Sequence, residues 1–435
     1  MAVYLITGAT GFLGKLLLED LLRRGRELSL EGVELLIRPQ ALGAGPRFRE
    51  GLARSPCFSA LGPGWSERVG VVAGDLSLPG CGLDAGDAQR LRERVTHVLH
   101  AAASVDFDLP LAAANAANAT TALHAIELAR GLARLRAFVS VSTAYATPHP
   151  GEGVPVEEKL APLPGPAEEL YAGIRSGGAD EAQLLERSGH PNTYTFTKSL
   201  AEHLLVARGS ELPLAIVRPS IISASWRRPF PGWIDSAAAF AGFVALIGAG
   251  HLRAVVGDPG TRVNLVPADW VARQVVDAAE DCVAGAPRIR HAVASASHSP
   301  RVEECRDAIL RFFRERPAGR RPAIRYLGPA GARFRLADGL HNRAPVRLSM
   351  LGSSRQRRRG RRLLGQLEAM NRIFPYFTQR SFAFRASHPF DEPGFDRVGY
   401  LALVCEGVAR HLLRSPAGGD PAGPRASRAS PGSGS

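Results

Sequence analysis

The chain has 435 residues, of which 45% are hydrophobic and 22% charged, so it can bury a full core and is too apolar to be disordered throughout. Its length fits one large or two modest domains. The formal net charge is +13, and residues 301–362, with 18 arginines against five acidic residues, account for all of it. This excludes a nucleic-acid footprint over the whole surface. We expect no nucleic-acid partner, and any anionic partner should bind near that segment.

The cysteines and the start of the chain bear on the compartment. Five cysteines are scattered, with no pair at metal-ligand spacing, so neither a metal site nor a disulfide framework is expected. Residues 1–6 look like a strand that runs into glycines, which is not the pattern of a cleavable signal. The longest nearly apolar stretch, residues 237–250, falls short of the roughly 20 residues needed to span a bilayer. We expect a cytoplasmic protein, peripheral to a membrane at most.

Short apolar runs alternate with longer helical patterns through the first half of the chain. Strands that are buried on both faces have such continuous apolar sequences, and their alternation with helices is typical of parallel sheets. The expected strands are 3–7, 33–37, 69–72, 98–101, 137–142 and 214–217. The expected helices are 12–24, 85–94, 109–132 and 194–208. The sequence therefore predicts an α/β fold with a doubly wound parallel sheet of the Rossmann type.

The rest of the chain predicts a smaller lobe and a helical C-terminal region. Excursions at about 148–192, with two short helices, and at about 225–265 are expected to build a substrate lobe on a main domain of residues 1–300. Residues 301–413 form a basic, mainly helical region. Residues 414–435 contain little besides Pro, Gly, Ser, Arg and Ala and are expected to be disordered.

A glycine-rich turn joins the first expected strand to the first helix, in the segment Thr7-Gly8-Ala-Thr10-Gly11-Phe12-Leu13-Gly14. Gly8 allows the tight turn, Gly11 lets the backbone approach a pyrophosphate at the helix N-terminus, and Gly14 permits close packing of helix on strand. The position between a strand and a helix favours a dinucleotide site over a plain turn. The glycine spacing resembles that of the extended short-chain dehydrogenase/reductase superfamily.

The ends of the next two strands bear on the choice of cofactor. The second strand ends at Arg38 and offers no carboxylate for the ribose hydroxyls of NAD. An arginine there suits a 2′-phosphate, which favours NADPH; in a chain with 51 arginines, an arginine at any one position is weak support by itself. Asp75, after the third strand, is placed to meet the adenine or to cap a helix.

Tyr194 and Lys198 stand four residues apart, which puts both on one face of a helix. A nearby cation lowers the pKa of a phenol, so we expect Tyr194 to exchange a proton near neutral pH. With only three lysines in the chain, chance is a poor explanation for this spacing. Thr143, or else Ser142, ends the neighbouring strand and would hold a reacting carbonyl through its hydroxyl; a plain capping role is the alternative.

Several longer blocks resemble the successive signature blocks of the fatty acyl-CoA reductases. They are His190-Pro-Asn-Thr-Tyr194-Thr-Phe-Thr-Lys198-Ser-Leu-Ala-Glu202, Val217-Arg-Pro-Ser-Ile-Ile222, Pro229-Phe-Pro-Gly-Trp-Ile-Asp235 and Val266-Pro-Ala-Asp269, with Val156-Glu-Glu-Lys159 and the segment from His100 to Phe107. Their order and spacing cover roughly residues 3–300, and the aromatic cluster at 374–384 is a weaker match. One departure, Asn118-Ala-Thr-Thr-Ala122, lacks the usual helix-packing glycine, and a local change of packing is expected there.

The resemblance implies NADPH-dependent reduction of a long-chain acyl thioester, on CoA or on a carrier protein, to an aldehyde or alcohol. Thr143, Tyr194 and Lys198 match the catalytic trio of that family. The residues expected to bind the cofactor are Thr7, Gly8, Thr10, Gly11, Phe12, Leu13, Gly14, Arg38, Asp75, Leu76, Ala102, Tyr194, Lys198 and Pro219.

Other functions remain open at this point. A nucleotide-sugar epimerase or dehydratase shares the fold and the Tyr/Lys pair, although the apolar stretch 237–247 suits an alkyl chain better than a sugar. A non-catalytic NADP-binding sensor is a third hypothesis, disfavoured because both Tyr194 and Lys198 are present. The basic run 355–362 could meet the CoA phosphates or a carrier protein, or an anionic membrane, or it could be a solvated arginine surface.

Overall fold

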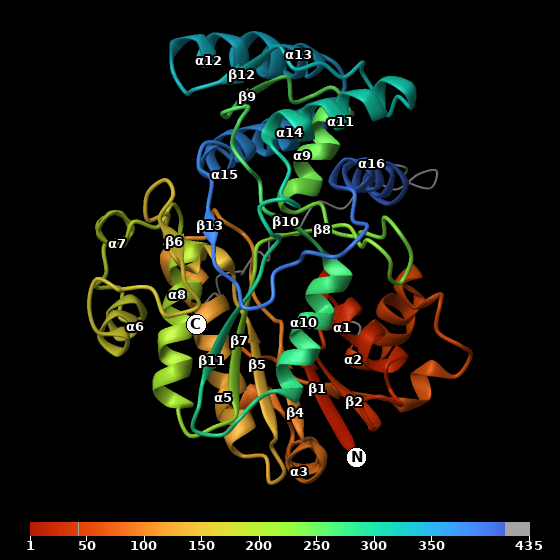
Figure 1. The fold of residues 1–435 in the computed structure, drawn as a ribbon, viewed down its shortest axis with the longest axis vertical. Helices are drawn as coiled ribbons and strands as arrows, with labels where there is room; N and C mark the ends of the chain where they lie inside the picture. Colours follow the sequence, from red (N-terminus) through yellow and green to blue (C-terminus); the bar gives the residue numbers. More distant parts are fainter. Residues whose placement is uncertain (42, 414–435) are drawn as a thin grey trace.

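A seven-stranded sheet forms the centre of the molecule. The structure is a computed structural model that describes residues 1–41 and 43–413. The sheet order is β11-β7-β5-β4-β1-β2-β3, and every neighbouring pair is parallel (Figure 1). The strands are β1 (Ala2–Thr7), β2 (Leu30–Ile37), β3 (Val69–Ala73), β4 (His97–His100), β5 (Ala137–Val141), β7 (Leu214–Pro219) and β11 (Arg288–Ala292). The predicted doubly wound parallel sheet is confirmed.

Helices cover both faces of this sheet. One face carries α1 (Phe12–Arg23) and α10 (Ala268–Glu280), and the other carries α3 (Ala85–Arg94), α5 (Thr121–Arg130) and α8 (Thr193–Arg208). Alternate side chains of β1 enter the two cores, with Tyr4 and Ile6 in one and Val3 and Leu5 in the other. The strands are continuous apolar runs because both of their faces are buried.

Two parts of the sheet half differ from the sequence-based expectation. The sequence-based expectation that the alternation of strands and helices fades after about residue 225 holds only for the excursion, because the chain then returns to the sheet as α10 and β11. Since β11 is an edge strand with an exposed Arg288, it lacks the continuous apolar pattern of the inner strands. The helix expected over 109–132 is divided into α4 (Leu111–Asn115), a π-helical turn (Ala116–Thr120) and α5. The π-helical turn contains Asn118, where a local change of packing was expected.

The first excursion contains the two expected short helices, α6 (Ala167–Arg175) and α7 (Glu181–Ser188). It also contains β6 (Pro155–Val156), which pairs in parallel with β13 (Ala383–Phe384) from the C-terminal region. A three-residue helix, α2 (Ala44–Pro46), follows β2. The excursion and the C-terminal region are therefore joined although they lie more than 200 residues apart in sequence.

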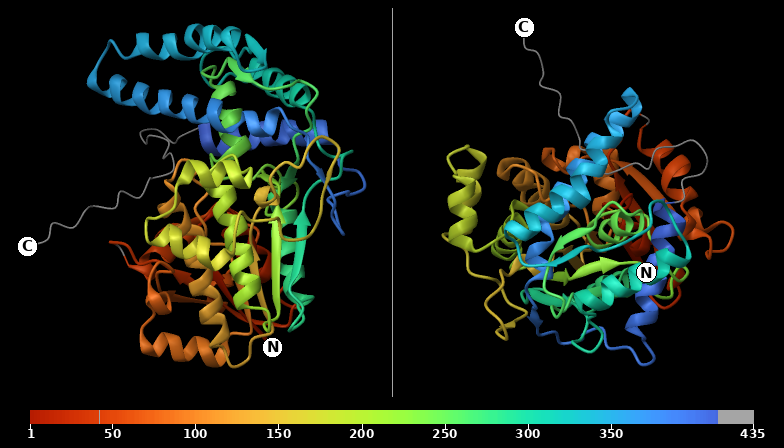
Figure 2. Two further views of the ribbon diagram at one scale, coloured as in Figure 1. Left: turned by 90° about the vertical axis from the view of Figure 1, so that its left-hand side faces the viewer. Right: turned by 90° about the horizontal axis from the view of Figure 1, so that it is seen from above.

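The second excursion and the C-terminal region share one hydrophobic core and form a single lobe above the carboxyl ends of the strands (Figures 1 and 2). Its elements are β8 (Ile221–Ser223), α9 (Ala239–Gly248), β9 (Ala254–Val256), β10 (Leu265–Pro267), α11 (Val302–Glu315), β12 (Tyr326–Gly328), α12 (Ala332–Ala337), α13 (Ala344–Ser349), α14 (Ser354–Ile373), α15 (Pro375–Thr378) and α16 (Arg397–Val408). Two parallel strand pairs hold the second excursion. β8 pairs with β10, which brings its two ends together, and β9 pairs with β12 of the C-terminal region.

The C-terminal segment and the length of the apolar helices were also subjects of prediction. The disorder predicted for 414–435 lies outside the described residues. Within residues 1–41 and 43–413, none of the helices combines the length and the apolar character that crossing a bilayer requires.

Candidate active site

The glycine-rich turn leaves no room for side chains where β1 meets α1. Gly8 has a φ of +75°, and a Cβ on it would lie 2.7 Å from the Ala102 amide nitrogen. A Cβ on Gly14 would lie 2.2 Å from the Gly8 carbonyl oxygen. Gly11 is the N-cap of α1 and no side chain caps the amides that follow it, while Thr10 and Gly11 are exposed. This open backbone at a helix N-terminus fits the pyrophosphate of a dinucleotide.

The residues around this turn hold the ends of the strands in register. Thr7 Oγ1 and His100 Nδ1 form a 2.9 Å hydrogen bond between β1 and β4. Burial lowers the pKa of His100 to about 3, so its ring is neutral at physiological pH. Phe12 packs on Trp233 with ring centroids 5.1 Å apart, and Leu13 is partly buried beside it. The sequence interpretation did not assign the link between Thr7 and His100.

Two arginines lie together after β2. Arg38 is exposed, and the guanidinium of Arg47 donates to the Arg38 carbonyl oxygen. Burial and the positive charge of Arg38 lower the pKa of Arg47. Neither arginine has a carboxylate partner among the described residues, so the pair fits a phosphate. Arg47 was missed because, among so many arginines, its place beside Arg38 shows only in three dimensions.

Three further residues predicted to bind the cofactor, Asp75, Leu76 and Pro219, lie at the same edge of the sheet and make local contacts within the protein. Asp75 accepts hydrogen bonds from the Ser77 amide at 2.9 Å and the Ser77 hydroxyl at 2.8 Å, so it caps a turn rather than a helix. Leu76 is buried, and its carbonyl oxygen lies 2.7 Å from His124 Nδ1. Pro219 ends β7 opposite Ala292 of β11. Their proposed contacts with the cofactor stay predictions.

Tyr194, Lys198 and Thr143 meet where α8 packs against the end of β5. Lys198 is buried and its Nζ donates to the Val141 carbonyl oxygen at 2.7 Å. The Thr143 hydroxyl, two residues further on, accepts from the Tyr145 amide at 3.3 Å and lies near enough to the Tyr194 hydroxyl to lower its pKa. Phe107, from the loop after β4, packs edge-on against the Tyr194 ring at 5.2 Å. Ser142 and Thr143 are equally buried, at 5% exposure, and it is the Thr143 hydroxyl that lies near the tyrosine, while the Ser142 hydroxyl has no hydrogen-bond partner among the described residues.

The expected lowering of the Tyr194 pKa is wrong for the protein alone. Burial raises the pKa of Tyr194 to about 12, and the nearby Thr143 hydroxyl offsets only part of this effect. Lys198 donates to a backbone carbonyl instead, and burial lowers its own pKa to about 8. Desolvation is therefore the dominant effect on Tyr194, which carries its proton at neutral pH.

A buried ion pair fixes α8 beside β7. Arg218 Nε donates to Glu202 Oε1 at 2.9 Å, and Arg218 Nη2 donates to Glu202 Oε2 at 2.5 Å. Both side chains are at most 1% exposed. Glu202 lies one helical turn beyond Lys198 and its charge partly offsets the lowering of the lysine pKa. The resemblance blocks contain both residues, but the sequence alone did not show that they pair.

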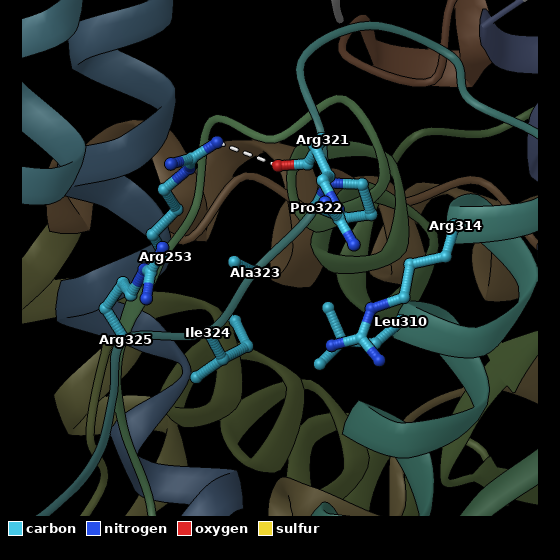
Figure 3. A pocket seen from close by; sticks show the side chains of 8 residues that line it. All are labelled: Arg253, Leu310, Arg314, Arg321, Pro322, Ala323, Ile324 and Arg325. Carbon is cyan, nitrogen blue, oxygen red and sulfur yellow. Dashed lines mark hydrogen bonds between the residues drawn. The ribbon is translucent and has the colours of Figure 1, made fainter.

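A concave site lies in the lobe, away from the glycine-rich turn (Figure 3). It is a cavity of about 350 Å³ with an apolar floor that includes Leu310, Pro322 and Ile324. Its rim carries Arg253, Arg314, Arg321 and Arg325. Arg253 is held by the Gly250 carbonyl oxygen at 3.0 Å and the Arg321 carbonyl oxygen at 2.8 Å. No carboxylate among the described residues forms an ion pair with any of these four side chains.

The fold and the glycine-rich turn define an NAD(P)-binding domain of the Rossmann type. The terminal R domain from the myxalamid PKS-NRPS biosynthetic pathway matches with a TM-score of 0.63 and 21% identity, covering 94% of this chain and 90% of that one. The reductase (R) domain of a nonribosomal peptide synthetase from Mycobacterium tuberculosis matches with a TM-score of 0.59 and 20% identity, covering 95% and 91%. At this identity these likenesses speak for the fold alone.

Sequence comparison is more specific. The family described as male sterility protein, an NAD-binding family, matches residues 6–275. Fatty acyl-CoA reductase 1 of Gallus gallus is 35% identical over 284 residues, and fatty acyl-CoA reductase wat of Drosophila melanogaster is 34% identical over 292. The chain belongs to this fatty acyl-CoA reductase family. The matches cover 63% of the chain and 53–54% of these relatives, so they span about half the relatives' length. The epimerase and sensor alternatives are not favoured.

Proposed function

We propose that this protein is an NADPH-dependent reductase of long-chain acyl thioesters that produces a fatty aldehyde, a fatty alcohol or both. The observation that carries the proposal is the meeting of Thr143, Tyr194 and Lys198 next to the open glycine turn, in a chain of the fatty acyl-CoA reductase family. An aromatic wall behind Thr143 suits an alkyl chain: Tyr145 packs against Phe377, Phe382 and Phe384 at 4.7 to 5.6 Å.

The residues divide the reaction between them. When bound, NADPH supplies the hydride. Thr143 and Tyr194 donate hydrogen bonds to the thioester oxygen as it gains negative charge. Because its pKa lies at about 12, Tyr194 holds its proton at neutral pH and can deliver it in the reducing direction. Lys198 adds a positive charge beside the site while it stays protonated. The hemithioacetal that results would then break its C–S bond as its hydroxyl proton passes to the sulfur, which leaves the aldehyde and the free thiol.

The preference for NADPH over NADH rests on Arg38 and Arg47. A charge-assisted contact to a phosphate is worth about 1.5–3 kcal/mol, or roughly tenfold to over a hundredfold in affinity. We expect Arg38→Asp to shift the ratio of kcat/KM values from NADPH toward NADH by about this factor. Arg49→Asp, in the same segment, is the matched control. If the unmutated protein used both cofactors equally, the 2′-phosphate role would be wrong.

We further propose coenzyme A as the acyl carrier, with its phosphates in the arginine cavity of the lobe. A small concave site with an apolar floor and a guanidinium rim suits a nucleotide head better than a carrier protein surface. Burial lowers the pKa of Arg253, and the nearby positive charges of Arg320 and Arg325 lower it further.

This choice of carrier can be tested with a truncated substrate. The double variant Arg314→Gln and Arg321→Gln should raise KM for an acyl-CoA by about tenfold. KM for the matching S-acyl-N-acetylcysteamine, which lacks the nucleotide, should not change. Equal KM values for acyl-CoA in variant and unmutated protein would place the CoA head elsewhere or favour a carrier protein.

The central test is an assay of the purified chain with NADPH and a series of acyl-CoAs, with products identified by gas chromatography. We expect NADPH consumption that depends on the acyl-CoA. One NADPH per thiol released indicates an aldehyde product, and two indicate an alcohol. No consumption with any chain length, under conditions where NADPH binds, would overturn the proposed function.

A further inference from the structure

The outermost helix of the lobe buries polar side chains and exposes apolar ones, the reverse of an ordinary amphipathic helix on a protein surface. This stretch, residues 332–349, comprises α12, the π-helical turn Asp338–Arg343 and α13, and we call it the outer helix. It lies beside α14 at the far edge of the lobe from the sheet (Figures 1 and 2). Its inward positions recur every four residues at Asp338, Asn342 and Val346, which are 5%, 1% and 4% exposed. Two of these three buried residues are polar.

Leucines occupy the opposite side. Leu336, Leu340 and Leu348 each stand two positions from an inward residue, about 200° around the helix, and are 73%, 60% and 67% exposed. Leu351, in the turn that follows, is 82% exposed. Apart from Met1, these are the four most exposed large hydrophobic side chains in the described part of the chain. Such a concentration of apolar surface marks a site of interaction.

Hydrogen bonds fix this orientation. Asn342 Oδ1 accepts from the amides of Arg253 at 2.7 Å and Ala254 at 3.0 Å, and Asn342 Nδ2 donates to the Ala254 carbonyl oxygen at 2.9 Å. Asp338 accepts from Asn342 at 2.8 Å and from Asn371 at 2.9 Å. Turning the leucines inward would break all of these bonds, so the helix is built to present them outward.

Arginines surround the leucines. Of the eleven arginines on the outer helix and the neighbouring α14, Arg343 pairs with Asp338 and Arg372 pairs with Asp108. The other nine are at 333, 335, 347, 355, 357, 358, 359, 361 and 362. None of the nine forms an ion pair with another residue of the described chain. Exposed leucines bordered by basic side chains are the signature of a helix that lies in the interface of an anionic bilayer. A second copy of this chain would instead set like charges against each other.

We infer that the outer helix docks on an anionic lipid bilayer, with Leu336, Leu340, Leu348 and Leu351 in the interface and the flanking arginines on the lipid phosphates. The sequence hypothesis of a membrane contact through 355–362 involves only the charged half of this surface, and the structure adds the apolar half. The inference does not depend on the proposed reduction, since it concerns a surface outside the site of Tyr194 and Lys198.

Vesicle flotation tests the inference. The unmutated protein should float with vesicles of phosphatidylcholine and phosphatidylglycerol at a molar ratio of 7:3, and less so with phosphatidylcholine alone. Replacing the four leucines by glutamine should lower the partition coefficient by about tenfold or more. Leu78→Gln, an exposed leucine outside the lobe, is the matched control and should float like the unmutated protein.

The arginines have a separate test. Replacing Arg355, Arg357 and Arg358 by glutamine should remove the preference for phosphatidylglycerol, and raising the salt concentration should detach the unmutated protein. Equal flotation of the leucine variant and the unmutated protein, or no flotation of the unmutated protein, overturns the inference. So does a dimer in solution that the leucine substitutions convert to a monomer, because a second copy would then cover the leucines.

Turnover separates this inference from the proposed function. With hexanoyl-CoA and no lipid, the leucine variant should consume NADPH at the rate of the unmutated protein. If neither protein consumes NADPH with hexanoyl-CoA or with any longer acyl-CoA of the series while the flotation results hold, the proposed function fails and the membrane surface stands. If both proteins consume NADPH and neither floats, the membrane inference fails and the proposed function stands.

Discussion

Helix α10 and the outer helix differ in the kind of side chain that each buries. In α10, the inward residues include Val271, Val275 and Val276, all fully buried, and the helix packs on α1 over the sheet. The outer helix buries Asp338 and Asn342 and exposes leucines. Burial of apolar surface holds α10 in place. A network of hydrogen bonds holds the outer helix, and its apolar surface remains available to a partner.

The same difference distinguishes the two halves of the molecule, which cover their apolar surface to different extents. The sheet half completes its two cores with its own helices and carries the site of Tyr194 and Lys198. The lobe completes one core around α9, α11, α14 and α16, yet leaves its outer edge apolar and basic. Substitutions in the sheet half should therefore affect turnover and folding, whereas those on the outer face of the lobe should affect only where the protein binds.

The largest expected effect lies at Tyr194. Tyr194→Phe removes the hydroxyl that would donate to the thioester oxygen, and loss of general acid catalysis lowers rates by about 10²–10⁴-fold. NADPH affinity, measured by fluorescence titration, should change little because the ring and its packing on Phe107 remain. Turnover close to that of the unmutated protein would show that the chemistry lies elsewhere.

The ion pair between Arg218 and Glu202 should give the largest loss of stability. Arg218→Met leaves a buried carboxylate without its partner, which costs about 3–5 kcal/mol in the free energy of unfolding. The double variant with Glu202→Leu should recover much of that loss, because no unpaired charge then remains buried. Urea denaturation of both variants is the measurement. A single variant as stable as the unmutated protein would contradict the structural role given to this pair.

The pH dependence of kcat/KM for NADPH should show a limb at about pH 8. Burial lowers the pKa of Lys198 from the usual lysine range to about 8, so the ammonium is charged below that pH and loses its charge above it. Since kcat/KM reports the free protein, its value should fall about tenfold per pH unit above the limb. Tyr194, with a pKa of about 12, adds no limb below pH 10. A flat profile to pH 9.5 would mean that the charge of Lys198 is not required.

The sheet half was predictable because its physical signals are local. Strands buried on both faces have continuous apolar sequences, and the spacing of Gly8, Gly11 and Gly14 between a strand and a helix indicates a dinucleotide turn. Tyr194 and Lys198 share a helix face because they are four residues apart. These features depend on near neighbours in sequence, so a single sequence contains them.

What the sequence did not predict depends on distant contacts. The edge strand β11 has arginines at alternate positions, 288 and 290, and Arg47 comes to lie beside Arg38 only when the chain folds back. The Tyr194 pKa depends on burial by elements from several parts of the chain. The outer helix is the clearest case, because its orientation is set by Asn342 bonding to residues almost 90 positions earlier, against the usual rule that leucines turn inward.

The smallest expected effects test that reversed helix directly. Leu340→Ala removes a side chain that is 60% exposed and should change the free energy of unfolding by less than about 0.5 kcal/mol. Asn342→Ala leaves the amides of Arg253 and Ala254 without their acceptor and should cost about 1–3 kcal/mol. In α10 the order is the usual one, since Val275→Ala opens a cavity in the core while the exposed Arg273→Ala costs little. Urea denaturation of the four variants compares the two helices. If Leu340→Ala proved more destabilising than Asn342→Ala, the leucine would be packed inside the protein, and the surface proposed to bind lipid would not exist in solution.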